Sequence, residues 1–331
     1  MSLLLKNTRL LDMVSEEPNL KKKDILIEKN IILKIEDEIE EIADKVIDCK
    51  NKIVMPGLIN THTHLAMSIF RGYNDDKTLM DWLQNAIFPV EDKFEQRDFY
   101  WNSYLSCLEM IKSGTTTCND MYFGMEHIIP AIEDAGIRAI VSWCITDDSI
   151  RNKPDETRKF AIRFNSDKNS KIKVCVSAHA PYSCNPETIG MVVNLAKELN
   201  TGIHIHLSET ITEEKQINSN YGKSATEYLN DLGVFDIPAV LAHGIHLSDK
   251  DIEILKKVKG GISHNPISNC KLSAGICDVT TLIKNGIKVG LGTDGAGSAT
   301  TLDLFEEMRL CAYLQKVSKM DAEAIKAYDI L

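Results

Sequence analysis

Short apolar runs alternate with amphipathic helical stretches from Ile53 to the end of the chain, and this rhythm constrains the fold more than any other feature. Apolar runs without polar alternation are typical of parallel strands covered on both faces, and the helical stretches supply the crossovers between them. Eight such units favour a closed (β/α)8 (TIM) barrel of the α/β class over an open sheet. The predicted strands are Ile53–Asn60, Thr115–Asp120, Arg138–Trp143, Lys171–Ala178, Gly202–Leu207, Ala239–Ala242, Gly261–Ser263 and Lys288–Gly292. The predicted helices are Phe99–Ser113, Met125–Asp134, Asp155–Asn165, Pro186–Leu199, Ser224–Leu232, Ser248–Lys257, Val279–Asn285 and Leu302–Gln315.

Residues 1–55 have a different sequence pattern, with short predicted strands separated by turn residues. They predict a small β domain in front of a barrel that spans residues 56–331. The isolated basic run Lys21–Lys23 is expected to be a solvated turn rather than a binding patch. The predicted strands of the small domain are Ser2–Leu11, Asp24–Glu28, Ile31–Ile35 and Lys45–Asp48.

Composition excludes several classes of partner. The 331 residues carry a formal net charge of −10, which argues against a nucleic acid as the main partner, because phosphate binding requires clustered Lys and Arg. The N-terminus has no signal-peptide pattern and no apolar run is long enough to span a bilayer, so we expect a cytoplasmic protein without a membrane partner. The nine cysteines lack the paired spacing of a metal site and are expected to be reduced core thiols.

Reactive side chains follow the predicted strands at the end where a barrel builds its site. In a closed barrel the loops after the strands form the active site, so reactive residues should follow the C-terminal ends of strands. Any one of these histidines alone would more often be a structural residue, but the set at one barrel face indicates a shared site. The residues are His62 and His64 after the first strand, His179 after the fourth, His206 and Glu209 at the end of the fifth, His243 after the sixth and Asp294 after the eighth.

Four of these residues form a candidate metal site. His62 and His64 are two apart in a strand, so both side chains point toward the same face. With His206 and Asp294 they offer three nitrogens and one carboxylate, a set suited to one Zn²⁺ ion with a position left for water. Fe²⁺ and Mn²⁺ accept the same ligands. The metal would lower the pKa of the water toward about 7, and Asp294 would accept its proton.

Glu209 and His243 are the candidate proton-transfer residues. Glu209 lies three residues beyond His206 and is not needed as a ligand, so we assign it as a general acid–base at the mouth of the site that protonates a substrate nitrogen. His243 is expected beside the metal, where it hydrogen-bonds the attacking oxygen or the developing charge. His204 should lie one layer deeper than His206 and form a hydrogen bond in the core.

Two sets of motifs decide which family the chain resembles. The first set is Pro56–His64, His204–Glu209, Ala242–His243, Ser263–Asn269 and Gly292–Gly295, and the second is Met67, Arg71–Gly72, Asp75–Asp76, Leu79–Leu83 and Phe88–Glu91. The first set resembles the amidohydrolase superfamily. The second resembles the 5-methylthioadenosine/S-adenosylhomocysteine deaminases and the similar 5′-deoxyadenosine deaminases within it.

This resemblance implies one zinc ion and hydrolytic removal of the adenine 6-amino group, which gives an inosine-type product and ammonia. It also implies that Glu91 binds the ribose hydroxyls and that His179 contacts the substrate. Binuclear relatives bridge two ions through a modified lysine on a central strand. Here the fourth strand ends in Ala178-His179 without a lysine, in keeping with a single ion.

Two features depart from the family pattern. Members that accept S-adenosylhomocysteine carry an arginine after the third strand to pair with the amino-acid carboxylate, whereas this chain has Trp143-Cys144. Arg151 lies nearby and is the remaining candidate for that carboxylate. We therefore expect 5′-deoxyadenosine, methylthioadenosine or adenosine as substrates ahead of S-adenosylhomocysteine. The chain also stops at Leu331, in what should be the next helix, so the C-terminal half of the small β domain, a composite sandwich, is expected to be missing.

Other functions stay open at this point. A related aminohydrolase acting on guanine, cytosine or a triazine fits the metal set, although Glu91 favours a ribosyl group because a carboxylate pairs with a cis-diol. A catalytically inactive relative of the same fold is the alternative outside catalysis, but it should have lost ligands and none is lost. The resemblance also implies a homo-oligomer whose small-molecule partner is an adenine nucleoside.

Overall fold

Two units make up the chain, and each is described by itself. The computed structural model describes residues 1–14, 20–148 and 151–331. The first unit is Met1–Gly57 and the second is Leu58–Leu331.

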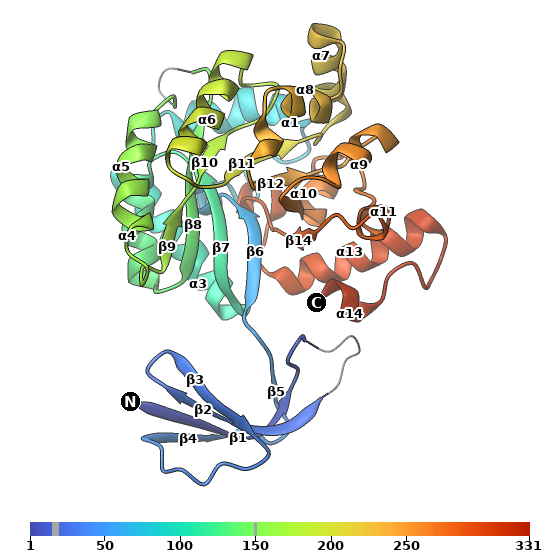
Figure 1. Cartoon of the computed structure of the whole chain (residues 1–331). Helices are drawn as coiled ribbons and strands as arrows, with labels where there is room; N and C mark the ends of the chain where they lie inside the picture. The colour runs from blue at the N-terminus through green and yellow to red at the C-terminus, as the bar shows by residue number, and fades with distance from the viewer. Residues whose placement is uncertain (15–19, 149–150) are drawn as a thin grey trace. The chain divides into compact units, whose positions relative to one another are not determined.

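The first unit is a five-stranded sheet in the order β3-β2-β1-β4, with β5 beside β1 (Figure 1). The β1–β2 and β2–β3 pairs are antiparallel, whereas β4 and β5 run parallel to β1. A small core of Leu4, Leu26 and Ile39 holds this unit together. The strands are β1 (Ser2–Leu10), β2 (Lys21–Glu28), β3 (Ile31–Glu36), β4 (Lys45–Asp48) and β5 (Ile53–Val54).

Two predictions about this region are wrong. The predicted first barrel strand, Ile53–Asn60, is split: β5 pairs with Arg9 and Leu10 of the small sheet, and the barrel strand begins only at Leu58. Pro56 lies in the break, where its missing N–H prevents it from continuing a strand ladder. The Lys21–Lys23 run is not a turn but the start of β2, paired with β1. Its long side chains reach neighbouring carboxylates, as in the 2.9 Å contact between Lys21 Nζ and Asp12.

The second unit is a barrel of parallel strands, which confirms the predicted fold. Its strand order is β14-β13-β12-β11-β10-β8-β7-β6, with β9 also paired to β8. Cys175 separates β9 from β10, so these two pieces together form the predicted fourth strand. The strands are β6 (Leu58–Thr63), β7 (Thr115–Tyr122), β8 (Arg138–Ile145), β9 (Ile172–Val174), β10 (Val176–Ala178), β11 (Ile203–Leu207), β12 (Ala239–His243), β13 (Gly260–His264) and β14 (Val289–Leu291).

Hydrogen bonds close the barrel between its last and first strands. Thr293 N–H donates to the His62 carbonyl at 3.1 Å, and Thr61 Oγ1 donates to the Leu291 carbonyl at 2.9 Å. The Asn60 amide joins the same seam through Thr293 Oγ1 at 2.8 Å. Residues more than two hundred positions apart in sequence therefore meet at the end of β6, which carries His62.

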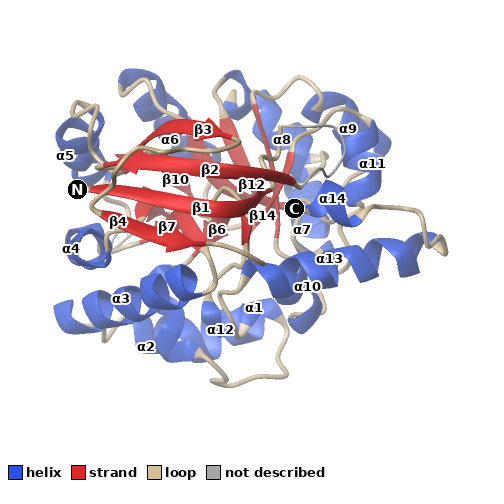
Figure 2. Cartoon of the chain, turned by 90° about the horizontal axis from the view of Figure 1, so that it is seen from below, coloured by secondary structure: helices blue, strands red, loops and turns tan. Residues whose placement is uncertain are grey.

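Helices surround the barrel strands (Figure 2). The helices whose positions the sequence predicted are α3 (Gln96–Lys112), α4 (Met125–Ala135), α5 (Pro154–Asn165), α6 (Pro186–Glu198), α8 (Ala225–Asp231), α9 (Asp249–Leu255), α11 (Val279–Lys284) and α13 (Leu304–Lys319). α14 (Ala327–Ile330) lies where the next helix was expected to begin. Further helical segments were not predicted: η1 (Leu65–Phe70), α1 (Leu79–Trp82), η2 (Leu83–Ile87), α2 (Phe88–Glu91), α7 (Ile211–Tyr221), η3 (Val234–Asp236), α10 (Pro266–Lys271) and α12 (Ala296–Ala299). Several are shorter than two turns, too short for a hydrophobic period to show, whereas α1, η2 and α2 follow one another without a break and the π-helical η2 interrupts their period.

Local chemistry fixes where several barrel helices begin and end. The Asn185 side chain accepts from Thr188 N–H at 2.9 Å, and Ser248 and Asp251 cap each other at the start of α9. Gly136 ends α4 in the left-handed region with φ of 77°. Such caps satisfy amides and carbonyls that the helix itself leaves without partners.

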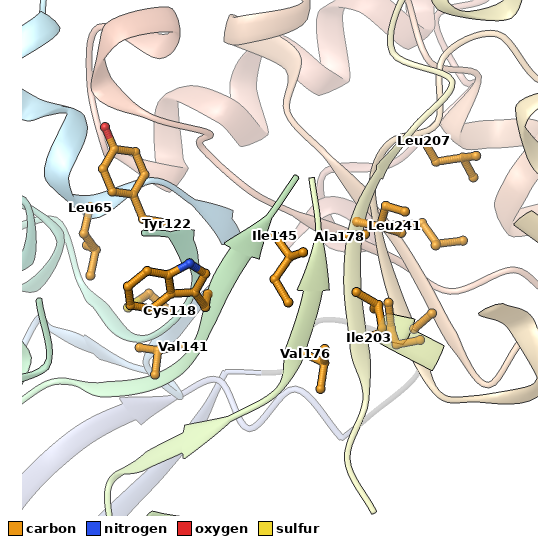
Figure 3. Close-up of a cluster of buried hydrophobic side chains, with 14 of the residues drawn as sticks. Leu65, Cys118, Tyr122, Val141, Ile145, Val176, Ala178, Ile203, Leu207 and Leu241 are labelled. Carbon is orange, nitrogen blue, oxygen red and sulfur yellow. The ribbon is translucent and has the colours of Figure 1, made fainter. Parts of the chain in front are cut away.

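The main hydrophobic core joins the strands to the helices around them. Figure 3 shows buried side chains from adjacent strands, including Val176 and Ile203, which are paired in register on β10 and β11. Ile145 and Ala178, at the ends of β8 and β10, form another such pair. None of the helices in the described part of the chain combines the length and apolar character that a bilayer crossing requires.

Candidate active site

A cavity of about 420 Å³ lies where the barrel strands end, and it collects most of the predicted site residues. Eight of the nine predicted residues line it, and the ninth, His62, is fully buried. The apolar part of the wall comes largely from η1, α1 and η2. The predicted residues in the wall are His64, Glu91, Arg151, His179, His206, Glu209, His243 and Asp294.

The imidazoles converge on the Asp294 carboxylate. His64 Nε2 lies 3.1 Å and His62 Nε2 3.5 Å from Asp294 Oδ1. Potential ligand atoms lie within 4.8 Å of one another in two overlapping sets, His62/His64/Asp294 and His62/His206/His243. The predicted ligands are thus brought together at one point, with His243 beside them.

Hydrogen bonds on the far side of each ring decide which nitrogen faces that point. His62 Nδ1 lies 2.9 Å from His204 Nε2, and His206 Nδ1 lies 2.6 Å from the His179 carbonyl. His64 Nδ1 contacts the Met121 carbonyl. A carbonyl accepts a hydrogen bond, so Nδ1 of His64 and of His206 carries a proton, and in the neutral ring Nε2 then presents its lone pair to the centre. His62 Nε2 has no hydrogen-bond partner among the described residues, which is what a metal-facing nitrogen requires.

Asp294 is held from behind by two donors. Gly295 N–H donates to Oδ1 at 2.7 Å and Ser268 Oγ donates to Oδ2 at 2.6 Å. Burial alone would raise the pKa of Asp294, but the close His62 and His64 imidazoles outweigh it and hold the pKa well below its usual range. Burial lowers the pKa of His62 to about 4. Burial also lowers the pKa of His64, yet the hydrogen bond and charge of Asp294 prevail and raise it to about 9.

Glu209 and His243 face each other across the cavity floor. His243 Nε2 lies 3.7 Å from Glu209 Oε1 and 3.9 Å from Asp294 Oδ2, while its Nδ1 lies 2.7 Å from Asn269 Oδ1. Glu209 was expected at the mouth of the site, but only 4% of it is exposed. Burial raises the pKa of its carboxyl. A carboxyl that keeps its proton more strongly suits a group that donates a proton.

Glu91 and Arg151 form a second polar group on the cavity wall. Glu91 accepts a hydrogen bond from the Tyr122 hydroxyl and lies 3.5 Å from Arg151 Nη2. Arg151 also pairs with Asp92 at 2.9 Å and Asp148 at 2.8 Å. Burial raises the pKa of Glu91, and the Tyr122 hydrogen bond and the Arg151 charge oppose that rise.

His179 reaches the cavity from the end of β10. Its Nδ1 lies 2.7 Å from Ser183 Oγ. Burial is the main cause that lowers its pKa, to about 3, and the positive charge on His64 adds to it. At neutral pH His179 is therefore an uncharged ring that can exchange hydrogen bonds with a ligand.

Several residues that support the site had no role assigned from sequence. Tyr122 and Glu213 hold reactive residues through contacts that no local signal marks in advance. Ser268 and Asn269 hold Asp294 and His243, and for them the Ser263–Asn269 motif was the available signal. The Trp143 indole does not line the cavity: its Nε1 donates to the Arg151 carbonyl at 2.9 Å, and Cys144 lines the wall instead.

A family model described as "Amidohydrolase family" matches residues 53–331. The chain belongs to the amidohydrolase family. This amidohydrolase is 46% identical to the 5-methylthioadenosine/S-adenosylhomocysteine deaminase of Thermoanaerobacter pseudethanolicus, over 100% of the chain and 78% of that protein. It is also 46% identical to the 5′-deoxyadenosine deaminase of Methanocaldococcus jannaschii, over 93% of the chain and 75% of that protein.

Solved structures agree with the fold of this amidohydrolase. A zinc-bound adenosine deaminase from Xanthomonas campestris superposes with a TM-score of 0.93 at 27% identity, covering 99% of the chain and 77% of that structure. A guanine deaminase from C. acetobutylicum gives a TM-score of 0.90 at 22% identity, covering 100% and 84%. At 22% identity the second likeness bears on the fold alone.

Proposed function

We propose that this amidohydrolase removes the 6-amino group of adenosine-type nucleosides by hydrolysis. Water adds its oxygen to C6 of the adenine ring, the bond from C6 to the amino nitrogen breaks, and an inosine-type product and ammonia leave. The names of the relatives at 46% identity support this reaction. The observation that carries it is the convergence of the His62 and His64 Nε2 atoms on Asp294, next to Glu209 and His243, at one cavity.

The donor set fits one zinc ion, held by His62, His64, His206 and Asp294. Three Nε2 lone pairs and a carboxylate oxygen are ligands that Zn²⁺ prefers, although Fe²⁺ and Mn²⁺ accept them too. The zinc-bound adenosine deaminase of the same fold supports this choice. When bound, such an ion polarises water enough to make it a nucleophile at neutral pH.

The proton transfers fall to Asp294 and Glu209. Asp294, whose lowered pKa keeps it ionised, accepts the proton that the attacking water loses. Glu209 donates a proton to the ring nitrogen next to C6, which lets that nitrogen take up the electron pair displaced by the attack. The amino group then leaves as ammonia after a further proton transfer. His243 Nε2, 3.9 Å from Asp294 Oδ2, hydrogen-bonds the attacking oxygen and aims it at the ring.

Glu91 and His179 orient the nucleoside. Glu91 has two acceptor oxygens at the cavity wall, which match the two hydroxyl donors of a ribose cis-diol. His179 contributes a neutral ring at the cavity wall, its centroid 4.8 Å from that of the His206 ring, and contacts the substrate there. A bare base has no cis-diol, so this arrangement favours a nucleoside.

The surroundings of Arg151 favour an uncharged 5′ substituent. Its guanidinium already contacts three carboxylates and packs 4.8 Å from the Phe123 ring centroid and 5.3 Å from that of Phe88. A substrate carboxylate would have to displace one of these partners. The nearby apolar wall, from Met67, Leu79 and Leu83, instead suits a 5′ methyl or methylthio group. We therefore rank 5′-deoxyadenosine, methylthioadenosine and adenosine ahead of S-adenosylhomocysteine.

The test is a direct assay of the purified chain, with bound zinc measured on the same sample. Ammonia release and the adenine-to-hypoxanthine absorbance change are followed with 5′-deoxyadenosine, methylthioadenosine, adenosine and S-adenosylhomocysteine. We expect turnover of the first three nucleosides and weak turnover of S-adenosylhomocysteine. Glu209→Gln should keep its zinc and lose about 10²- to 10⁴-fold in kcat. A zinc-loaded wild-type protein that deaminates none of the four would show that the proposed reaction is wrong.

A further inference from the structure

Glu209 depends on its backbone for its position. Its carboxylate lies 3.7 Å from His243 Nε2, beyond hydrogen-bond distance, and no direct hydrogen bond from a described residue fixes it. The residue before it, Ser208, has a φ of 50°, in the left-handed region that a serine rarely adopts. The chain turns sharply here, directly after β11, and such a turn persists only where the surroundings hold it.

A buried carboxylate holds this turn from the following helix. Glu213, in the first turn of α7, accepts the Ser208 N–H on Oε1 at 3.1 Å and the Glu209 N–H on Oε2 at 2.8 Å. Only 2% of Glu213 is exposed. Two successive amides aimed at one carboxylate form an anion-binding concavity, filled here by a side chain of the same chain. Burial raises the pKa of Glu213, so its charge is costly at this position, and the two amides oppose the rise.

The same turn is tied to the segment that directly follows His243 and β12. The Ser208 carbonyl accepts from the N–H groups of Ile245 at 3.0 Å and His246 at 3.1 Å. Holding the Ser208 and Glu209 amides therefore fixes Glu209 relative to His243 as well as to α7. A loss of this hold would move the Glu209 carboxylate within the cavity without touching the metal ligands.

We propose that Glu213 is a positioning residue: it clamps the amides of Ser208 and Glu209 and so holds the Glu209 carboxylate at the reacting ring nitrogen. This inference rests on the proposed deamination, in which Glu209 is the proton donor. Glu213 contacts neither substrate nor metal in this role. Its contribution should therefore appear in kcat and leave KM and zinc content unchanged.

Glu213→Gln and Glu213→Asp test the clamp, with Glu214→Gln as the matched control. A glutamine keeps one acceptor oxygen but turns an NH₂ group toward an N–H donor, and an aspartate keeps both oxygens one methylene too short. Glu214 is adjacent and half-buried, and it binds Ser208 Oγ at 2.6 Å and Ala225 N–H at 3.2 Å rather than Glu209. The Glu214→Gln variant therefore measures how much kcat changes when a neighbouring carboxylate is removed while the Glu209 amide keeps its partner.

We expect kcat for 5′-deoxyadenosine to fall about 10²-fold in Glu213→Gln and about tenfold in Glu213→Asp, with KM and bound zinc unchanged. Glu214→Gln should keep its kcat. A crystal structure of the glutamine variant should show the Glu209 carboxylate displaced from its place 3.7 Å from His243 Nε2. If either folded Glu213 variant keeps the wild-type kcat, or raises KM alone, the clamp is wrong. If the wild-type chain itself is inactive, the proposed function fails, and the position of Glu209 in the variant crystal alone decides whether Glu213 holds it.

Discussion

Ser268 Oγ lies 2.6 Å from Asp294 Oδ2, so a hydroxyl from the short helix α10 holds a carboxylate that belongs to the end of the last barrel strand. Groups that orient metal ligands in this way typically account for 10- to 100-fold of metal affinity.

Ser268→Ala should therefore weaken zinc binding by about tenfold or more, because Asp294 would lose one of the donors that fix its orientation. Competition with a zinc chelator measures the affinity. Ser103→Ala is the control, because the Ser103 hydroxyl is buried and has no hydrogen-bond partner among the described residues. Equal zinc affinity in the two variants would contradict the role of Ser268.

Arg151→Met should raise KM for all accepted nucleosides, because the guanidinium neutralises and orients Glu91 at 3.5 Å. The assay is steady-state kinetics with 5′-deoxyadenosine and with S-adenosylhomocysteine. An effect of similar size on both substrates supports a role through Glu91. A loss confined to S-adenosylhomocysteine would show instead that Arg151 binds the amino-acid carboxylate.

Removing the metal should abolish ammonia release and lower the melting temperature. Zinc that binds only the folded chain stabilises it by about 4 kcal/mol when the free ion is at roughly 1,000 times its Kd. Calorimetry with chelator and then with added zinc measures both the loss and the recovery. His64→Asn should lose the zinc response, whereas His246→Asn should retain it, because His246 Nε2 binds the Ala274 carbonyl at 2.8 Å outside the metal site.

Glu213 also predicts how stability changes with pH. Burial raises its pKa in the folded protein from 4.5 to about 8. The folded state then binds this proton more tightly than the unfolded state, so the free energy of unfolding should decrease as pH rises from about 4.5 to about 8. Glu213→Gln should remove this part of the decrease, and Glu214→Gln should remove less of it. Melting temperatures from pH 6 to pH 8 give the slopes, and parallel curves for wild type and Glu213→Gln would contradict the raised pKa.

The parts of the site that the sequence could predict follow from the two-residue repeat of side-chain direction along a strand. Side chains two apart on a strand share a face, so His62 and His64 could be assigned together, and a barrel places all strand ends at one rim. His204 follows the same rule one layer below His206, and its 2.9 Å contact with His62 is the expected core hydrogen bond.

The remaining contacts depend on where distant segments meet. Glu213 reaches back to a turn whose left-handed Ser208 no sequence pattern marks, and α7 itself has a weak apolar stripe. The break at Pro56 was misjudged because the apolar run continues across it, although Ile53 and Val54 bind a different sheet. Apolar character predicts that a strand is buried, but not which sheet buries it.

The hydrogen bonds between Thr293 and His62 have a consequence for how the chain acquires its metal during synthesis. His62 and His64 emerge from the ribosome long before Asp294. They lie at the end of β6 on one side of the barrel seam, and Asp294 follows β14 on the other side. No complete coordination sphere exists until the last strand docks against the first. Metal uptake by this chain is therefore a late event that follows closure of the barrel. Once bound, the ion would stabilise the contact between the last strand and the first.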